Sequence, residues 1–200
     1  MSALRAKKNL PWDKVSIFHM DEYLGMSDRH SESFPRYIRE KLVNFVYPGA
    51  FYPMHGDASD VNMDLKRYAG FLREFPPDVC VLGIGENGHL AFNDPPADFE
   101  TQDVIHIVTL DERCRLQQVN EGHFRTLGDV PSRAITLTVP SLLAAKHVLA
   151  VVPEVRKAAA VKAALQGSVT PDCPASILRT KQNVTMFLDL ESASLLKWQK

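Results

Sequence analysis

The chain has 200 residues, of which 45% are hydrophobic and 24% charged, and its formal net charge is -1. These values are typical of an ordinary globular protein, and we expect one domain that spans residues 1–200. The near-neutral charge gives no electrostatic reason to expect nucleic acid or an anionic membrane as a partner, and no apolar stretch is long enough to span a bilayer.

Strand-like and helix-like patterns alternate along the chain after residue 14. This alternation predicts an α/β fold, with a Rossmann-like, doubly wound and mostly parallel sheet flanked by helices. The expected segments are a strand at 15–19, helices at 33–45 and 60–74, strands at 78–82 and 104–108, a helix at 111–120, a strand at 134–139, a helical turn at 141–145, a strand at 147–152, a helix at 154–166 that ends at Gly167, and a strand at 184–188.

The three cysteines, Cys80, Cys114 and Cys173, are scattered and none belongs to a CxxC pair. Neither a disulfide framework nor a zinc site is indicated, and the N-terminus lacks a secretory apolar region, so we expect a reduced, cytoplasmic protein. The histidines show no ligand spacing and there is no HExxH motif, which predicts that no metal is bound.

The most distinctive stretch is 82–94, which reads Leu-Gly-Ile-Gly-Glu-Asn-Gly-His-Leu-Ala-Phe-Asn-Asp. An apolar run stops at two glycines, and a histidine follows among acids and amides. This pattern predicts a buried strand that leads into a tight turn presenting the His89 imidazole, which titrates near neutral pH and suits proton transfer. A glycine-rich turn with an incidental histidine is the alternative interpretation.

Polar side chains follow the ends of three predicted strands. In open α/β sheets, ligands bind beyond the carboxyl ends of the strands, so these groups are expected at one rim. Each also has a structural explanation, as a turn-forming acid or a solvated helix face, although a lysine at a helix N-terminus suits a bound anion such as phosphate. The candidates are Asp21 and Glu22, then Asn87, His89 and Asp94, and finally Lys157.

Two of these stretches carry a family resemblance. Residues 18–25, Phe-His-Met-Asp-Glu-Tyr-Leu-Gly, followed by His30 and Ser33-Phe34, resemble the Asp-Glu-Tyr motif of glucosamine-6-phosphate deaminases, and residues 82–95 resemble their second signature. The 6-phosphogluconolactonases share the Gly-x-Gly-x-x-Gly-His core but are less similar, because the Asp-Glu-Tyr block and the Ala-Phe-Asn-Asp continuation favour the deaminases.

The resemblance implies conversion of glucosamine 6-phosphate and water to fructose 6-phosphate and ammonia, without a metal or organic cofactor. Asp21 matches the base that moves a proton from C2 to C1. His89 matches the group that opens the pyranose ring, and Asn87 and Asp94 match positions that orient its imidazole.

Substrate contacts are also implied. Lys157 matches a lysine that holds the substrate phosphate, and Glu22 is expected to contact the substrate. Backbone N–H groups near Gly85 and Gly88 are expected to stabilise the enolamine-like intermediate.

The chain departs from the family pattern in three respects. Nothing in it corresponds to the family's first strand and phosphate-wrapping loop, and Asn87 stands where some relatives have aspartate. Gln118 stands where a phosphate-binding arginine is expected, with Arg113 or Arg115 as the nearest substitute.

Two other functions therefore stay open. One is a sugar-phosphate lactonase in which His89 activates water and Asp21 is not needed. The other is a catalytically silent sugar-phosphate-binding module, although no helix-turn-helix or basic arm is present. The partner is in each case a small-molecule sugar phosphate, and the sequence does not decide whether the chain forms a homo-oligomer.

Overall fold

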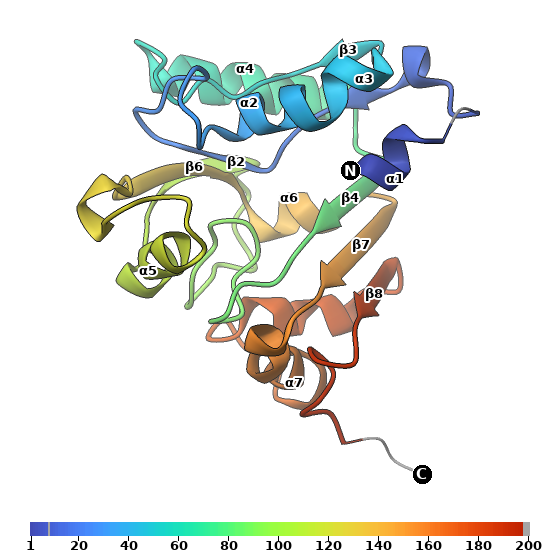
Figure 1. Cartoon of the computed structure of the whole chain (residues 1–200), viewed down its shortest axis with the longest axis vertical. Coiled ribbons are helices and arrows are strands. Elements are labelled where there is room, and N and C mark those ends of the chain that lie inside the picture. The colour runs from blue at the N-terminus through green and yellow to red at the C-terminus, as the bar shows by residue number, and fades with distance from the viewer. Residues whose placement is uncertain (8, 198–200) are drawn as a thin grey trace.

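The computed structural model describes residues 1–7 and 9–197, and helices and short strands alternate along them (Figure 1). Every predicted strand and helix has a counterpart, most with ends shifted by a few residues. The helices are α1 (Ser2–Arg5), α2 (Phe34–Ile38), α3 (Asn44–Val46), α4 (Val61–Glu74), α5 (Glu112–Asn120), α6 (Val139–Leu143) and α7 (Ala158–Gln166). The strands are β1 (Ser16–Ile17), β2 (Asp21–Tyr23), β3 (Ala50–Phe51), β4 (Val79–Leu82), β5 (Ile105–Thr109), β6 (Arg133–Leu137), β7 (His147–Val152) and β8 (Val184–Leu188).

The strands form three small sheets. β1 pairs with β3, and β7 lies between β4 and β8, all in parallel. β6 instead runs antiparallel to both β2 and β5. The mixed and mostly parallel α/β architecture predicted from the sequence is therefore confirmed, with an antiparallel sheet that alternation alone did not reveal.

The helix predicted at 33–45 is one helical stretch with an irregular centre. Ser33 caps α2, its hydroxyl accepting a hydrogen bond from the Arg36 N–H at 3.5 Å. A π-helical turn, Arg39–Val43, then separates α2 from α3. Because a π turn inserts an extra residue, it rotates the following side chains, and Phe45 is 57% exposed beneath the Arg5 guanidinium instead of lying in the core.

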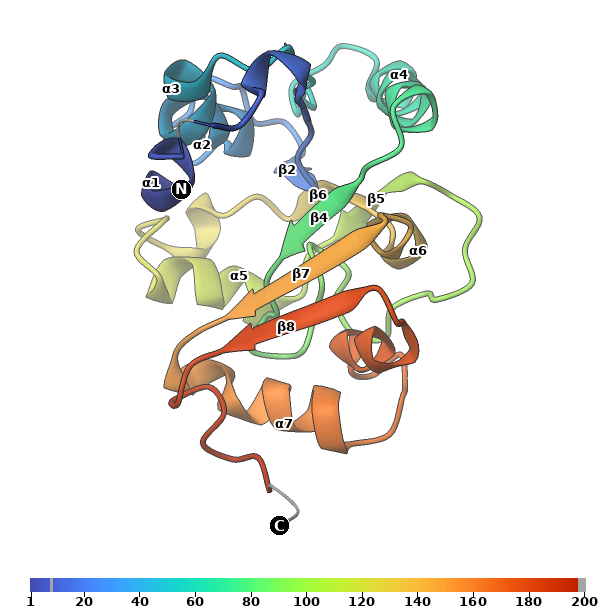
Figure 2. The same ribbon diagram turned by 90° about the vertical axis from the view of Figure 1, so that its right-hand side faces the viewer.

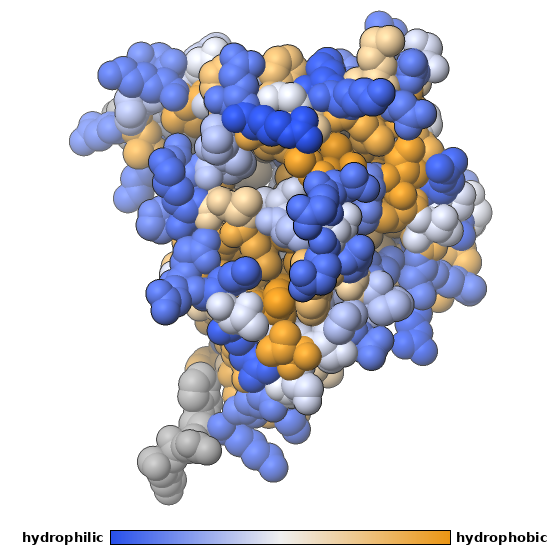
Figure 3. Space-filling view, turned by 180° about the vertical axis from the view of Figure 1, so that it is seen from behind, coloured by the Kyte–Doolittle hydropathy of each residue, from blue (hydrophilic) through white to orange (hydrophobic). Residues whose placement is uncertain are grey.

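The main hydrophobic core lies between the sheets and the helices α4, α6 and α7. Tyr68 of α4, Leu142 of α6 and Val161 of α7 are completely or almost completely buried in it, together with Val148 and Ala150 of β7. Seen from behind, hydrophobic residues reach the surface between clusters of hydrophilic ones (Figure 3). None of the described helices combines the length and the apolar character needed to cross a bilayer.

One face of the β4–β7–β8 sheet is apolar and exposed. Val81, Val151 and Phe187 are 58%, 47% and 54% exposed, whereas Leu82 and Val152, which point to the other face, are buried. Figure 2 looks onto this sheet, and no described helix covers it there. Parallel sheets usually carry apolar cover on both faces, so this surface is unusual for its strand type.

Candidate active site

A cavity of about 340 Å³ lies where β2 begins and where β4 and β7 end. Its lining includes Asp21, Gly85, His89 and Lys157, so the structure brings these predicted site residues together from distant parts of the sequence. A second hollow of about 270 Å³, between the segment 99–104 and α6, contains none of the predicted site residues. The candidate site is therefore the first cavity.

Asp21 is held at the cavity by backbone pairing. It opens β2 opposite Thr136 of β6, and its carbonyl oxygen accepts a hydrogen bond from the His19 imidazole, 2.9 Å away. Burial raises the pKa of the Asp21 carboxyl from 3.8 to about 7. A carboxylate with such a pKa is a much stronger base than an exposed aspartate.

His19 has a structural role beside Asp21. It is 6% exposed, and burial lowers its pKa to about 4, so the ring stays neutral at neutral pH. Its Nε2 atom accepts the Met54 N–H at 2.8 Å, which leaves the proton on Nδ1 for the Asp21 carbonyl. The Tyr68 hydroxyl exchanges hydrogen bonds with the backbone of His19 and ties this segment to α4.

The glycine turn after β4 places His89 at the cavity. A Cβ atom on Gly85 would overlap the His89 ring, so the imidazole can pack here only against glycine. Gly88 has a φ of +86°, in the left-handed region that glycine adopts without strain. The Gly85 N–H donates to the His89 carbonyl and the Gly88 N–H to the Gly85 carbonyl, both at 3.0 Å. These two amides therefore have partners within the turn, and their role toward an intermediate stays a prediction.

Polar contacts connect Asn87, His89 and Asp94. The Asn87 side chain accepts the His89 backbone N–H at 3.1 Å and donates to Asp94 Oδ1 at 3.0 Å. His89 Nδ1 lies 3.1 Å from Asp94 Oδ1, and both side chains are 11% exposed. Burial by itself would raise the pKa of Asp94, but His89 and Asn87 more than offset it and hold that pKa below its usual range. Asp94 therefore stays ionised beside the imidazole.

Glu22 does not line the cavity, although it follows Asp21 directly. It is 1% exposed, and its carboxyl accepts hydrogen bonds from the Ser33 hydroxyl and the Tyr23 N–H, both at 2.7 Å. Burial raises its pKa to about 7. Successive residues of a strand point to opposite faces, which is why Glu22 faces the cap of α2. We therefore propose that Glu22 positions β2 against α2 and does not bind substrate.

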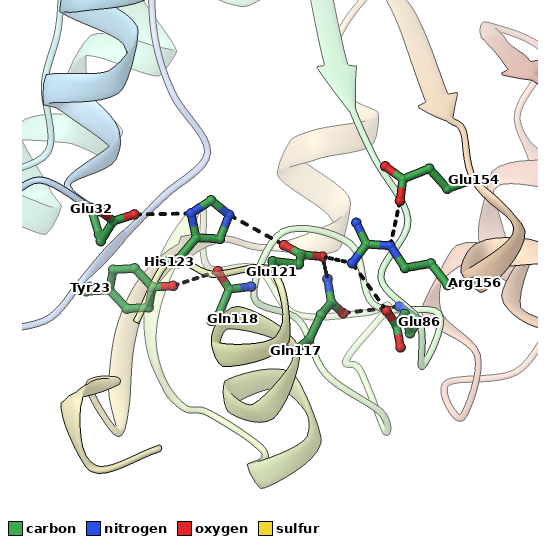
Figure 4. A network of polar contacts seen from close by, with 9 residues as sticks. All are labelled: Tyr23, Glu32, Glu86, Gln117, Gln118, Glu121, His123, Glu154 and Arg156. Atoms are coloured by element: carbon green, nitrogen blue, oxygen red, sulfur yellow. Dashed lines mark hydrogen bonds and ion pairs between the residues drawn. The ribbon is translucent and has the colours of Figure 1, made fainter. Parts of the chain in front are cut away.

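Lys157 lies at the start of α7 and reaches the cavity. Its side chain is half-buried, and burial lowers the pKa of its ammonium group. Its neighbour Arg156 is fully engaged elsewhere, with ion pairs to Glu154 and Glu121 at 2.8 Å and to Glu86 at 3.6 Å (Figure 4). Lys157 is the lysine at this rim that an anionic substrate group can reach.

Glu121 is the centre of a polar network that the sequence did not reveal (Figure 4). Besides Arg156, it accepts a hydrogen bond from Gln117 at 2.8 Å and lies 3.6 Å from His123, which contacts Glu32 at 3.1 Å. Gln117, Glu121 and His123 all line the cavity. The network thus joins the end of α5 to the segment before α7 and to the loop before α2.

Gln118 also lines the cavity, and its carbonyl oxygen accepts a hydrogen bond from the Tyr23 hydroxyl at 3.2 Å. Arg115 does not replace the arginine expected there. Its guanidinium donates to the carbonyls of Leu127 and Val130 at 2.7 and 2.9 Å, and neither Arg115 nor Arg113 lines the cavity. Both proposed substitutes are therefore wrong.

The comparisons with known proteins identify the family of this chain. The family described as glucosamine-6-phosphate isomerases/6-phosphogluconolactonase matches residues 1–187. The chain belongs to this family. Among curated family members, the glucosamine-6-phosphate deaminase of Bacillus cytotoxicus is 38% identical over 189 residues, covering 94% of this chain and 71% of that protein. The enzyme of the same name from Exiguobacterium sibiricum is 37% identical over 182 residues, covering 91% of this chain and 71% of that protein.

Solved structures of the family have the same fold. A monomeric glucosamine-6-phosphate deaminase of the NagB superfamily superimposes with a TM-score of 0.87 and 31% identity, covering 97% of this chain and 80% of the other. The 6-phosphogluconolactonase of Thermotoga maritima gives a TM-score of 0.70 at 17% identity, covering 92% of this chain and 76% of the other. At that identity the second similarity concerns the fold alone.

Proposed function

We propose that this family member is a glucosamine-6-phosphate deaminase, which converts glucosamine 6-phosphate and water to fructose 6-phosphate and ammonia. The observation that carries the proposal is one cavity that contains Asp21, whose carboxyl pKa is raised to about 7, and an imidazole paired with a carboxylate, His89 with Asp94. Relatives named for this activity, at 37% and 38% identity, support it.

In the first proposed step, His89 opens the pyranose ring. It takes the proton of the anomeric hydroxyl and delivers a proton to the ring oxygen, so one imidazole serves both transfers. Asp94, 3.1 Å away, stabilises the imidazolium that forms between them, and Asn87 fixes Asp94 relative to the turn. Ring opening gives an aldehyde at C1 beside the amine at C2.

In the second step, Asp21 removes the C2 proton and returns it to C1. A pKa of about 7 brings this carboxylate close to the working pH, where general base catalysis is most effective. The product is an iminium at C2, which water hydrolyses to the ketone and ammonia. The reaction is therefore an aldose–ketose isomerisation coupled to a hydrolytic deamination, and acid–base groups suffice for it without a cofactor.

Lys157 is proposed to bind the phosphate. It stands at the N-terminus of α7, where the helix dipole adds to its positive charge. Glu121 faces the same cavity, and its ion pair with Arg156 at 2.8 Å offsets the repulsion that it would exert on a dianion. We also propose that the chain acts as one domain in the cytoplasm, where its three free thiols would stay reduced.

The direct test is to incubate the protein with glucosamine 6-phosphate and to measure ammonia and fructose 6-phosphate together. Equal amounts of both are expected. The same protein with 6-phosphogluconolactone should release no more acid than the buffer does. Lactone hydrolysis without ammonia would overturn the proposal, and tight binding of glucosamine 6-phosphate without turnover would leave a binding module instead.

A further inference from the structure

Cys114 is a buried thiol next to the proposed catalytic imidazole, and the proposed reaction does not use it. It belongs to α5, is 2% exposed, and comes from a part of the sequence distant from the glycine turn. Its Sγ atom, His89 Nδ1 and a carboxylate oxygen of Asp94 all lie within 4.8 Å of one another. Sequence spacing could not group these residues, because only the packing of α5 against the turn makes them neighbours.

A second observation concerns the buried ring nitrogen of His89. His89 Nδ1 is buried and makes no hydrogen bond, although Asp94 Oδ1 lies 3.1 Å away. Buried polar atoms are rarely left in this state. A deprotonated Nδ1 atom has an electron pair for a cation, and the thiol and the carboxylate lie close enough to supply two more ligands.

We propose that a thiophilic divalent cation of the zinc and cadmium class binds between His89, Asp94 and Cys114 and inhibits the enzyme. Sulfur, nitrogen and oxygen are the donors that zinc takes in proteins, and a water molecule would complete a tetrahedron. Magnesium and calcium avoid sulfur and need more oxygen ligands, so the site should discriminate against them.

The geometry needs only a small adjustment. In a tetrahedral zinc site with bonds of about 2.0–2.3 Å, the donor atoms lie roughly 3.3–3.7 Å apart. The separations, which are now 4.8 Å or less, therefore have to close by about 1.5 Å at most. Asp94 Oδ2 already accepts the Asp111 N–H at 3.1 Å, and Asp111 caps α5, so the turn and the helix that carries Cys114 are fastened together.

The cation would inhibit the enzyme because it would bind to groups that the proposed ring opening needs. It would take the Nδ1 electron pair and the Asp94 carboxylate, and the thiol proton would leave to solvent. His89 could then no longer be stabilised by Asp94 as an imidazolium during ring opening. The loss of activity rests on the proposed function, whereas binding of the cation does not.

Binding is tested first, without any activity assay. Cobalt(II), a coloured substitute for zinc, should bind one per chain, produce a thiolate-to-cobalt charge-transfer band in the near ultraviolet, and be displaced by zinc. A Cys114→Ala variant should lose the band, and the matched Cys80→Ala variant should keep it. Absence of the band, or a band that survives in Cys114→Ala, would overturn the site.

A second measurement needs no variant and so does not depend on whether Cys114→Ala folds. X-ray absorption by the zinc-loaded wild-type protein should show one sulfur ligand at about 2.3 Å. A shell of nitrogen and oxygen alone would overturn the site. In the deaminase assay, the zinc concentration for half-inhibition should be about tenfold higher or more for Cys114→Ala than for the wild type. A chelator should restore the activity of the zinc-inhibited wild-type enzyme. The same half-inhibition concentration in both proteins would overturn the inhibitory role.

Discussion

Replacing Asp21 by asparagine should remove activity and at the same time stabilise the fold above neutral pH. The wild-type carboxyl has a pKa of about 7 in the folded protein, against 3.8 in the unfolded chain. Folding at high pH therefore places an ionised carboxylate in an unfavourable environment, which an amide of the same shape avoids.

The size of the effect follows from the shift in pKa. A shift of about 3 pH units, at about 1.36 kcal/mol per unit, corresponds to about 4 kcal/mol of lost stability. This is an upper limit, because Asp21 lines the cavity and is only partly buried. Below about pH 4 both states are protonated and the loss is absent. It grows between about pH 4 and pH 7, where the folded state binds more protons than the unfolded state, and is constant above pH 7.

The assay is urea unfolding of the wild type and the Asp21→Asn variant at about pH 4, 6 and 8. The variant should be equally stable at the lowest pH and more stable by roughly 2–4 kcal/mol at the highest. Asp57→Asn, at an exposed position, is the matched control and should show no such trend. A variant that is less stable at about pH 8, or a difference that does not change with pH, would refute the reasoning.

Ionisation of Asp21 lowers the stability of the fold but should raise the catalytic activity. Because the base must be ionised, kcat/KM of the wild type should rise with pH and level off above about pH 7. At and above about pH 7, the turnover of Asp21→Asn should be lower than that of the wild type by about 10²–10⁴-fold. A pH-independent kcat/KM between about pH 5 and pH 8 would contradict the assignment of Asp21 as the base.

Three further changes test the rest of the site and the exposed sheet. Lys157→Gln should raise KM about tenfold or more with little change in kcat, measured by steady-state kinetics; a fall in kcat alone would exclude a role in phosphate binding. Gly85→Ala should lower kcat, because the added Cβ would displace the His89 ring. The control is Gly70→Ala, in open space on α4, which should keep wild-type kcat and leave the stability unchanged or raise it by about 1 kcal/mol. Equal kcat values in the two variants would contradict the role of Gly85. Phe187→Lys should reduce binding of the dye ANS without lowering the urea midpoint, and unchanged fluorescence would show that the exposed sheet face is not the dye site.

The sequence by itself predicted most of the secondary structure, because each long element carries a clear periodicity. α4 begins at its Asp60 cap, and β7 and β8 have the predicted bounds. It missed β2 and β3, which are very short. Asp21 and Glu22 look like a polar turn, and only pairing with β6 makes them part of a strand.

In the candidate site too, the sequence predicted some features and only the tertiary structure decided others. The sequence identified Asp21, His89 and Lys157, since each follows a strand, and strand ends converge at one edge of an α/β sheet. Only the tertiary structure decided that Glu22 turns away to Ser33 and that the Gly85 and Gly88 amides have partners within the turn.

The packing of α5 could not be predicted from the sequence either. It brings Glu121 and His123 to the cavity and Cys114 to the imidazole, yet these residues carry no motif and lie far along the chain from the residues that they meet. Periodicity is a local property that neighbouring residues encode. Which way a side chain points, and what it meets there, depends on the register of strands and helices that touch only after the chain has folded.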